Sequence, residues 1–286
     1  MQSKGSSCCG ESKTVPQRPD EIKEFVKSRY GRMISDQKRG SCCGPGDERI
    51  EAKVAPAAGY TDEELAQVPA HAVEHSLGCG NPVALAGLQP GQTVLDIGSG
   101  AGIDVLLAAR KVGPQGRVIG LDLTPEMIQV AEKNAADAGV TNAEFRLGDA
   151  ENMPVESETV DWIISNCVIN LAPDKEKVFR EAYRVLRPGG RMLISDIVTK
   201  NLPQEIRQSA QAWAACVAGA IEEDDYLDAM RRAGFAEVEV VARLDYDEDS
   251  ILAILDCSER LSEELADFAP ALGGRIASIR VSAVKP

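Results

Sequence analysis

The sequence predicts an α/β protein whose sheet is mostly parallel and wound with helices on both faces. From Thr93 onwards, short apolar runs alternate with segments of helical periodicity, and this alternation is typical of parallel sheets. The first apolar run passes directly into three alternate glycines, which is the pattern of a tight turn between a strand and a helix. The chain has 286 residues, of which 44% are hydrophobic, so it is long enough to bury a large core.

The segment before this sheet is expected to form an amino-terminal arm over residues 1–60, followed by the main domain over 61–286. A helix is predicted from Pro19, because proline suits the first turn and apolar residues follow at helical spacing. These residues are Ile22, Phe25, Val26 and Tyr30. The sequence G-S-C-C-G-P-G at 40–46 predicts a loop with two adjacent cysteines, and Thr61 with Glu64 has the spacing of a capping box.

Five strands are expected in the main domain, with helical patterns between them. They cover residues 93–97, 117–122, 143–147, 160–165 and 191–198. The sequence P-G-G at 188–190 predicts a turn into the fifth strand, and helical stretches at 203–219 and 222–233 follow it. Beyond Phe235 we expect a strand, then a helix at 248–267 inserted before the last strand, I-A-S-I-R-V-S-A-V.

The decisive stretch is T-V-L-D-I-G-S-G-A-G, residues 93–102, in which Asp96 precedes three alternate glycines. Glycines here let the backbone adopt positive φ and let a ligand lie against main-chain N–H groups at the start of a helix. A dinucleotide fold expects G-x-G-x-x-G, but Ile103 stands in the place of the third glycine. The loop instead resembles the cofactor loop of the Rossmann-like S-adenosylmethionine methyltransferases. A generic nucleotide loop or a structural turn remains an alternative, because a glycine-rich loop alone is a weak signal.

Acidic residues at the ends of the next strands support a nucleoside site beside this loop. Asp122 ends the second strand about twenty residues after the glycines, where a carboxylate accepts hydrogen bonds from ribose hydroxyls. Asp149 follows the third strand, where it would meet an adenine amino group. Each aspartate alone is also a common helix cap, whereas acids at three successive strand ends favour a ligand site. The residues assigned to the cofactor are Asp96, Gly98, Gly100, Gly102, Asp122, Leu123, Gly148, Asp149, Ala150 and Asn166.

The charge balance argues against nucleic acid as a partner. There are 45 Asp and Glu residues against 31 Lys and Arg, a net charge of -14, whereas binding to phosphates requires concentrated basic residues. No apolar run is long enough to span a bilayer, and the start of the chain, M-Q-S-K-G-S-S-C-C-G, lacks the apolar centre of a signal peptide. We therefore expect a cytoplasmic protein without a membrane partner.

Eight cysteines are present, and no pair has the C-x-x-C spacing of a structural zinc site. Cys167 ends the fourth strand, Cys79 precedes the first strand in G-C-G-N-P, and Cys216 is expected on the long helix after the fifth strand. Thiolates select soft centres. A trivalent metalloid such as As(III) accepts three sulfurs and keeps a lone pair that can attack the methyl group of a sulfonium. Any one of these cysteines is also a common core residue.

Several motifs together resemble those of the arsenite S-adenosylmethionine methyltransferase family, over roughly residues 19 to 235. They are G-C-G-N-P, V-L-D-I-G-S-G-A-G, S-N-C-V-I-N-L followed by P-D-K, F-R-E-A-Y-R-V-L-R-P-G-G and C-V-A-G-A. The resemblance implies the class I methyltransferase fold with an antiparallel closing strand, and S-adenosylmethionine as cofactor. It also implies arsenite bound by cysteine thiolates, methylated arsenicals as products in arsenic detoxification, and thioredoxin or glutathione as the reductant of cysteine disulfides.

Carried over by motif, the resemblance gives catalytic roles to four cysteines, Cys43, Cys79, Cys167 and Cys216. Cys167 and Cys216 would hold As(III), and Cys79 would join them or form the redox disulfide. Cys43, in the loop of the arm, would be a fourth redox or delivery cysteine. The sequence departs from the family at E-H-S-L before Cys79, where some members carry an aromatic residue, and it matches weakly after Phe235.

Two other functions fit parts of the sequence. One is a methyltransferase for a small organic acceptor such as a quinone or sterol, in which the cysteines are incidental and Cys167→Ser leaves methyl transfer intact. The other is a non-catalytic, thiol-based metalloid-binding protein, which binds As(III) without consuming S-adenosylmethionine. The second is disfavoured because Asp96, Asp122 and Asp149 are all in place.

Overall fold

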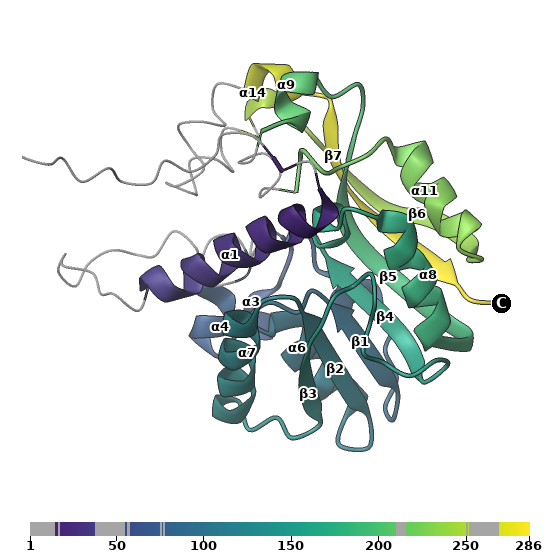
Figure 1. Cartoon of the computed structure of the whole chain (residues 1–286). Helices are drawn as coiled ribbons and strands as arrows, with labels where there is room; N and C mark the ends of the chain where they lie inside the picture. The colour runs from purple at the N-terminus through teal and green to yellow at the C-terminus, as the bar shows by residue number, and fades with distance from the viewer. Residues whose placement is uncertain are drawn as a thin grey trace, which may run out of the picture.

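The computed structural model describes residues 15–16, 18–37, 55, 58–74, 76, 78–209, 216–249, 251 and 269–286. Its centre is a seven-stranded sheet with the order β3-β2-β1-β4-β5-β7-β6 (Figure 1). The strands are β1 (Thr93–Ile97), β2 (Arg117–Asp122), β3 (Ala143–Leu147), β4 (Val160–Asn166), β5 (Leu186–Thr199), β6 (Ala236–Tyr246) and β7 (Ile276–Val284). The helices are α1 (Pro19–Gln37), α3 (Asp62–Leu65), α4 (Ala70–Glu74), α5 (Pro82–Leu85), α6 (Ile103–Val112), α7 (Pro125–Asp137), α8 (Lys175–Val185), α9 (Gln204–Arg207), α11 (Glu223–Arg232) and α14 (Ala269–Leu272), with a short 3-10 helix at Ile169–Leu171.

The predicted doubly wound sheet is confirmed. Strands β3, β2, β1, β4 and β5 pair in parallel, and β7 pairs antiparallel to both β5 and β6. The last strand therefore is the antiparallel strand that the family resemblance implied. Within β1, Leu95 packs in the core beneath α8 and α11, whereas Val94 packs in the core beneath α6. Alternate residues of one strand thus serve the two faces, as a sheet buried on both sides requires.

The turn predicted at 188–190 is wrong. These residues lie inside β5, which begins at Leu186 rather than at Arg191. Val160 of β4 pairs with Leu186 and Trp162 pairs with Arg191, so the additional residues of β5 form a bulge. Gly189 has φ +76°, a conformation that glycine adopts at low cost.

The region predicted as a helix at 203–219 also differs. The helix α9 ends at Arg207, residues 210–215 lie outside the described part, and residues 216–219 form turns. Cys216 has φ +60°, which a right-handed helix does not allow. Cys216 therefore lies in a turn and not on a long helix. The helix predicted at 248–267 lies almost wholly outside the described residues.

Helix α1 crosses the carboxyl edge of the parallel strands (Figure 1). Ile34 packs with Ala101, Met127 and Val130, so the end of α1 is fixed against α7 and the start of α6. Before the helix, the Val15 N–H donates to the Gln208 carbonyl over 3.0 Å. The arm thus docks on two separated parts of the main domain. No helix among the described residues is long and apolar enough to cross a membrane.

Candidate active site

The glycine loop after β1 has the positive φ angles that its sequence predicts. Gly98, Gly100 and Gly102 all have positive φ, at +76°, +50° and +93°. The N–H groups of Gly98 and Ser99 both donate to the Leu121 carbonyl, which holds the loop on the end of β2. A Cβ at Gly98 would overlap Val168, whereas a Cβ at Gly100 would meet nothing within 4 Å. The loop is therefore packed against the protein at one end and open towards a ligand in the middle.

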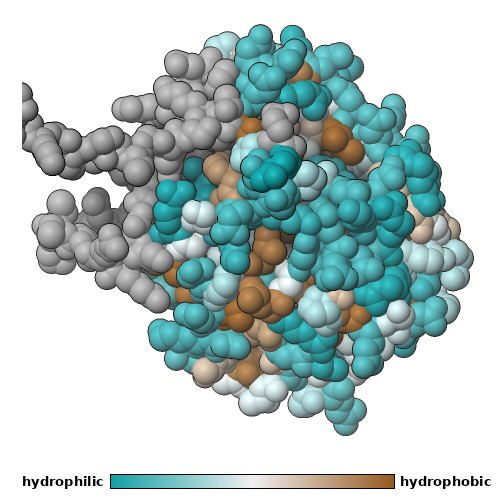
Figure 2. Space-filling view, viewed as in Figure 1, coloured by the Kyte–Doolittle hydropathy of each residue, from teal (hydrophilic) through white to brown (hydrophobic). Residues whose placement is uncertain are grey.

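A cavity lies between this loop, the carboxyl ends of the strands and α1. Figure 2 shows hydrophobic residues gathered at the centre of the same face, surrounded by hydrophilic ones. Most residues predicted to bind the cofactor line the cavity: Gly98, Gly100, Asp122, Leu123, Gly148, Asp149, Ala150 and Asn166. Asp96 and Gly102 do not line it. Gly102 instead forms the N-cap of α6, and Asp96 is only 2% exposed in β1.

Buried carboxylates surround this part of the cavity: Asp104 and Asp122 line it, and Asp96 lies near both of them without lining it. Asp96 Oδ1 is buried and has no hydrogen-bond partner among the described residues. Burial raises the pKa of Asp96 well above its usual range, and the nearby Asp104 and Asp122 add to this effect. Burial also raises the pKa of Asp104 to about 6, although hydrogen bonds from Tyr60 and Asn166 lower it. A ligand with an ammonium and a sulfonium group, as in S-adenosylmethionine, would compensate these charges, so the residues fit the cofactor.

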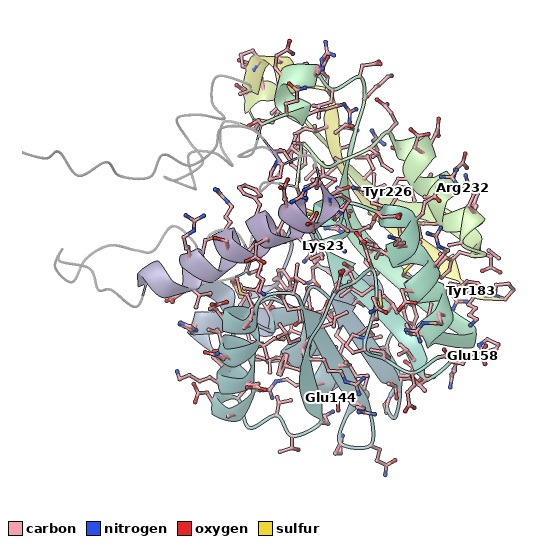
Figure 3. All side chains as sticks on the ribbon, in the orientation of Figure 1. Lys23, Glu144, Glu158, Tyr183, Tyr226 and Arg232 are labelled. Carbon is pink, nitrogen blue, oxygen red and sulfur yellow. A yellow bond between two sulfur atoms is a disulfide. The ribbon has the colours of Figure 1, made fainter. Side chains whose placement is uncertain are left out.

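Asp122 and Asp149 are held rigidly at the strand ends. Asp122 accepts hydrogen bonds from the N–H groups of Gly100 over 2.9 Å and Thr124 over 2.8 Å. Its carboxylate thus fixes the middle of the glycine loop as well as facing the cavity. Lys23 extends from α1 (Figure 3). Its Nζ atom lies 2.6 Å from Asp149 Oδ2. Lys23 also bonds to Glu151 over 2.7 Å, and it joins α1 to the loop after β3.

The sequence did not reveal the part that α1 plays in the site. Lys23, Val26 and Tyr30 all line the cavity, and the phenol of Tyr30 is hydrogen-bonded to the Cys216 thiol. Helical spacing indicated an apolar face, but nothing in the spacing showed which surface that face would cover. Asp104 and Tyr60 were also missed, because a single acid in the first turn of a helix is usually only a favourable partner of the helix dipole.

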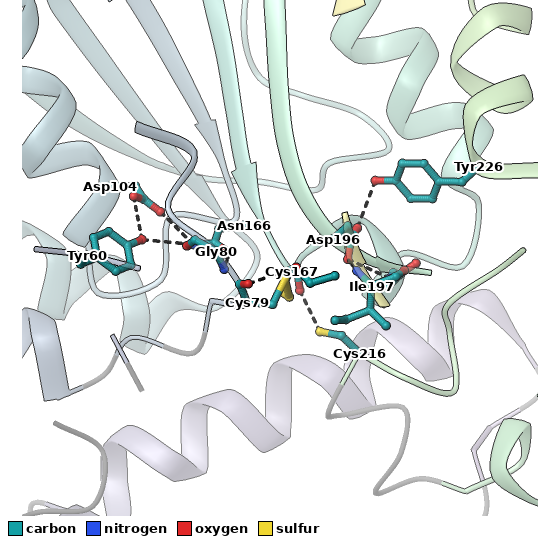
Figure 4. The surroundings of a disulfide bond; sticks show 12 residues. Tyr60, Cys79, Gly80, Asp104, Asn166, Cys167, Asp196, Ile197, Cys216 and Tyr226 are labelled. Carbon is teal, nitrogen blue, oxygen red and sulfur yellow. Dashed lines mark hydrogen bonds between the residues drawn. A yellow bond between two sulfur atoms is a disulfide. The ribbon is translucent and has the colours of Figure 1, made fainter. Parts of the chain in front are cut away.

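Three of the four predicted catalytic cysteines lie close together, and one of them, Cys167, lines the cavity (Figure 4). Cys79 and Cys167 form a disulfide, with their Cα atoms 5.8 Å apart. Cys216 is a free, buried thiol, and its Sγ donates to the Cys167 carbonyl over 2.8 Å. All three pack in one hydrophobic cluster with Ile197 and Leu202. The fourth, Cys43, lies outside the described residues.

Backbone strain marks two of these cysteines. Cys167 has φ +59° and Cys216 has φ +60°, in the left-handed region that residues with a side chain seldom adopt. Each such residue costs roughly 1 kcal/mol or more, so the surrounding structure must fix it. At Cys167 this is done by its N–H, which donates to the Ser195 carbonyl over 2.8 Å. The left-handed turn brings the Cys167 carbonyl to the Cys216 thiol.

A buried polar network lies beside Cys216. Asp196 is fully buried on β5 and accepts hydrogen bonds from Asn170 over 2.7 Å and Tyr226 over 3.1 Å. Burial raises the pKa of Asp196 to about 7, and burial lowers that of the nearby Lys175 to about 8. Burial and then Asp196 raise the pKa of the Cys216 thiol, whereas Lys175 lowers it. The thiol is therefore protonated at neutral pH in this form of the protein.

Comparison with known proteins places the chain in a family. The family model for a methyltransferase domain matches residues 88–234. The arsenite methyltransferase of Halobacterium salinarum is 44% identical over 82% of this chain and 62% of its own length. That of Aquipseudomonas alcaligenes is 36% identical over 85% of this chain and 68% of its own. The chain thus spans about two thirds of the length of these relatives.

A solved structure supports the same relationship. The crystal structure of an arsenic(III) S-adenosylmethionine methyltransferase from Chlamydomonas reinhardtii superposes with a TM-score of 0.65 at 35% identity. The match covers 77% of this chain and 71% of the algal one. Fold and sequence identity agree, and the organic-acceptor alternative is not favoured. The chain belongs to the arsenite S-adenosylmethionine methyltransferase family.

Proposed function

We propose that the protein transfers methyl groups from S-adenosylmethionine to trivalent arsenic held by Cys79, Cys167 and Cys216. The observation that carries this proposal is the convergence of the three sulfurs at the edge of the cavity, with Cys216 bonded to the backbone of Cys167. Residues from before β1, after β4 and after β5 meet there. A cysteine that only fills space in the core has no reason to lie against two other cysteines beside a ligand cavity.

Arsenite binding requires the disulfide to open first. Two electrons and two protons convert the Cys79–Cys167 disulfide to two thiols, and we propose thioredoxin or glutathione as their source. Each thiol then replaces one hydroxide of arsenite, so that an As–S bond forms, an As–O bond breaks and the thiol proton leaves with the hydroxide as water. Three such exchanges leave arsenic with three sulfur ligands and a lone pair. Cys43 remains a proposed redox or delivery cysteine.

The chain provides a binding site for the cofactor at the glycine loop. We propose that it is held by the ten residues assigned from sequence, Asp96, Gly98, Gly100, Gly102, Asp122, Leu123, Gly148, Asp149, Ala150 and Asn166. When bound, S-adenosylmethionine supplies a methyl group on a positively charged sulfur. The chain must hold the arsenic lone pair in line with that group and keep water away, and placement of this kind lowers the barrier without a general base. Methylated arsenicals and a role in arsenic detoxification follow from this proposal.

We also propose that residues 1–60 form an arm distinct from the domain at 61–286.

The proposal predicts that Cys167→Ser and Cys216→Ser abolish methylation of arsenite, with a loss of at least a hundredfold, because an oxygen ligand cannot replace a soft thiolate. Reduced protein, arsenite and S-adenosylmethionine are incubated, and S-adenosylhomocysteine and arsenic species are quantified by chromatography and mass spectrometry. Cys257→Ser serves as the matched control, since no motif assigns a role to that cysteine. Activity near that of the wild type in either site variant would overturn the assignment of arsenic to these sulfurs.

A further inference from the structure

The side chain of Asn166 forms a clamp on the segment that carries Cys79. Its Oδ1 accepts from the Gly80 N–H over 3.1 Å, and its Nδ2 donates to the Gly80 carbonyl over 2.5 Å (Figure 4). One amide therefore holds both polar groups of a single backbone residue. Gly80 follows Cys79 directly, and Asn166 precedes Cys167 directly. The clamp thus joins the neighbours of the two disulfide-bonded cysteines.

Further contacts make this clamp rigid. Asn166 Nδ2 also lies 3.1 Å from the Tyr60 hydroxyl and 3.3 Å from Asp104 Oδ2. Tyr60 in turn donates to Asp104 Oδ1 over 2.8 Å, and both side chains are buried, which fixes the orientation of the amide. A Cβ at Gly78 would overlap the Asn166 amide, so the two segments are in close contact.

The amide has little capacity left for a ligand, so Asn166 would contact the cofactor proposed above only through its carbon and backbone atoms. The two Nδ2 hydrogens already face three acceptors, and Oδ1 already accepts from Gly80. Although Asn166 lines the cavity, its polar atoms are directed at the protein. A second hold on the same segment comes from Ser278 of β7, whose hydroxyl donates to the Cys79 carbonyl over 3.1 Å. Neither hold depends on the bond between the sulfurs.

We propose that Asn166 is a positioning residue that keeps Cys79 beside Cys167 after their disulfide is reduced, so that the two thiols remain a preformed pair. This inference rests on the proposed function for its purpose, because the pair is taken to receive arsenic. The clamp is seen with the disulfide closed, and its persistence in the reduced protein, which is what we propose, is measurable without arsenic. It limits the separation of the thiols, and so it removes most of the entropy cost of bringing two sulfurs to one atom.

The test measures how strongly the protein favours the disulfide over its open form. Two molecules of glutathione reduce Cys79–Cys167 to two thiols and become one glutathione disulfide, so the equilibrium constant reports the effective concentration of one thiol near the other. Full-length protein is equilibrated in buffers of different glutathione ratio, alkylated, and the disulfide-linked peptide is quantified by mass spectrometry. Asn166→Ala removes the clamp, and we expect the effective concentration to fall about tenfold, as for the loss of one or two hydrogen bonds.

Asn142→Ala is the matched control. Its Nδ2 also donates to two backbone carbonyls, those of Ala109 and Gly113, but these lie at the other end of α6 from the cavity. This variant is expected to lower thermal stability and leave the thiol equilibrium unchanged. Equal equilibrium constants for Asn166→Ala and the wild type, or an equal shift in Asn142→Ala, would overturn the inference.

Tyr60→Phe keeps the test decisive if Asn166→Ala fails to fold. It leaves Asn166 in place and removes the hydroxyl that orients its amide, and the same equilibrium should shift in the same direction by about threefold. An unchanged constant in this variant would then refute the clamp. The proposed function is tested separately. If the wild-type protein did not methylate arsenite, that function would be refuted, whereas a shifted thiol equilibrium in Asn166→Ala would still establish the clamp.

Discussion

Asp196 is a buried acid whose environment makes the stability of the protein depend on pH. Burial raises its pKa to about 7, from an ordinary value of 3.8. A carboxyl whose pKa is higher in the folded than in the unfolded state stabilises the fold at low pH, and this contribution is lost as pH rises through the folded value. The relevant window therefore runs from about pH 4 to about pH 7.

Asp196→Asn should remove this dependence. An amide keeps the acceptor for Asn170 and carries no charge, so the free energy of unfolding should fall less between pH 4 and pH 8 than in the wild type. The difference between the two proteins should be roughly 2–4 kcal/mol, because one unit of pKa corresponds to about 1.4 kcal/mol. Urea unfolding at several pH values measures it. Parallel pH profiles for the two proteins would show that Asp196 does not titrate in this range.

At the scale of elements, α1 covers the cavity that we propose for the cofactor. Lys23 is partly buried and bonds to both Asp149 and Glu151, and Glu151 has only 5% of its side chain exposed. We expect Lys23→Met to weaken binding of S-adenosylmethionine roughly tenfold, mainly through faster dissociation, since charge-assisted bonds of this kind are each worth more than neutral ones. Calorimetry and stopped-flow fluorescence measure the affinity and the rate.

Lys27→Met is the control for this prediction. Lys27 lies one turn further along the same helix and does not line the cavity. Its replacement should leave the affinity for the cofactor within about twofold, because it alters neither the ion pairs of Lys23 nor the lining. A similar loss of affinity in both variants would mean that helix propensity or net charge causes the weaker binding, rather than the loss of the ion pairs between Lys23 and the two acids, Asp149 and Glu151.

The strands of the parallel sheet were predictable, and the approach of α1 was not. Strands β1, β2 and β3 have the predicted bounds, because β1 and β2 are short, mainly apolar segments and β3 alternates apolar and charged residues before Gly148. The capping box at Thr61 is also confirmed, since it depends only on residues three apart. By contrast, the position of Lys23 depends on its contact with Asp149, which is 126 residues away in the sequence. Local periodicity cannot predict a contact between residues so far apart in the chain.

The active-site residues divide in the same way. The glycine loop and Cys167 were predictable because a strand end fixes where they lie. Cys216 lies beside Cys167, as expected, but the helix predicted for it was wrong, because its backbone is left-handed and its thiol bonds to the Cys167 carbonyl. Asp104 and Tyr60 gave no separate signal in the sequence. The assignments of individual residues to cofactor and arsenic stay predictions.

At the scale of the whole molecule, arsenic bound by three sulfurs would tie together distant parts of the chain. Cys79 and Cys167 are 88 residues apart, and Cys216 follows β5. A ligand that binds only the folded protein stabilises it by about 2.7 kcal/mol at a concentration one hundred times its dissociation constant. Reduced protein with arsenite should therefore melt roughly 5 °C higher than without it. Differential scanning calorimetry measures this shift, and the oxidised protein, with the disulfide closed, should show a much smaller one.

The separation of the three cysteines also has a consequence during protein synthesis. The ribosome releases Cys79 well before Cys216, and in the folded protein the Cys216 thiol is bonded to the carbonyl of Cys167, the residue that directly follows β4. A growing chain therefore has thiols but lacks the three-sulfur site that we propose for arsenic. Under that proposal, capture at this site would begin only with the finished fold, when the cavity proposed for the methyl donor is also in place.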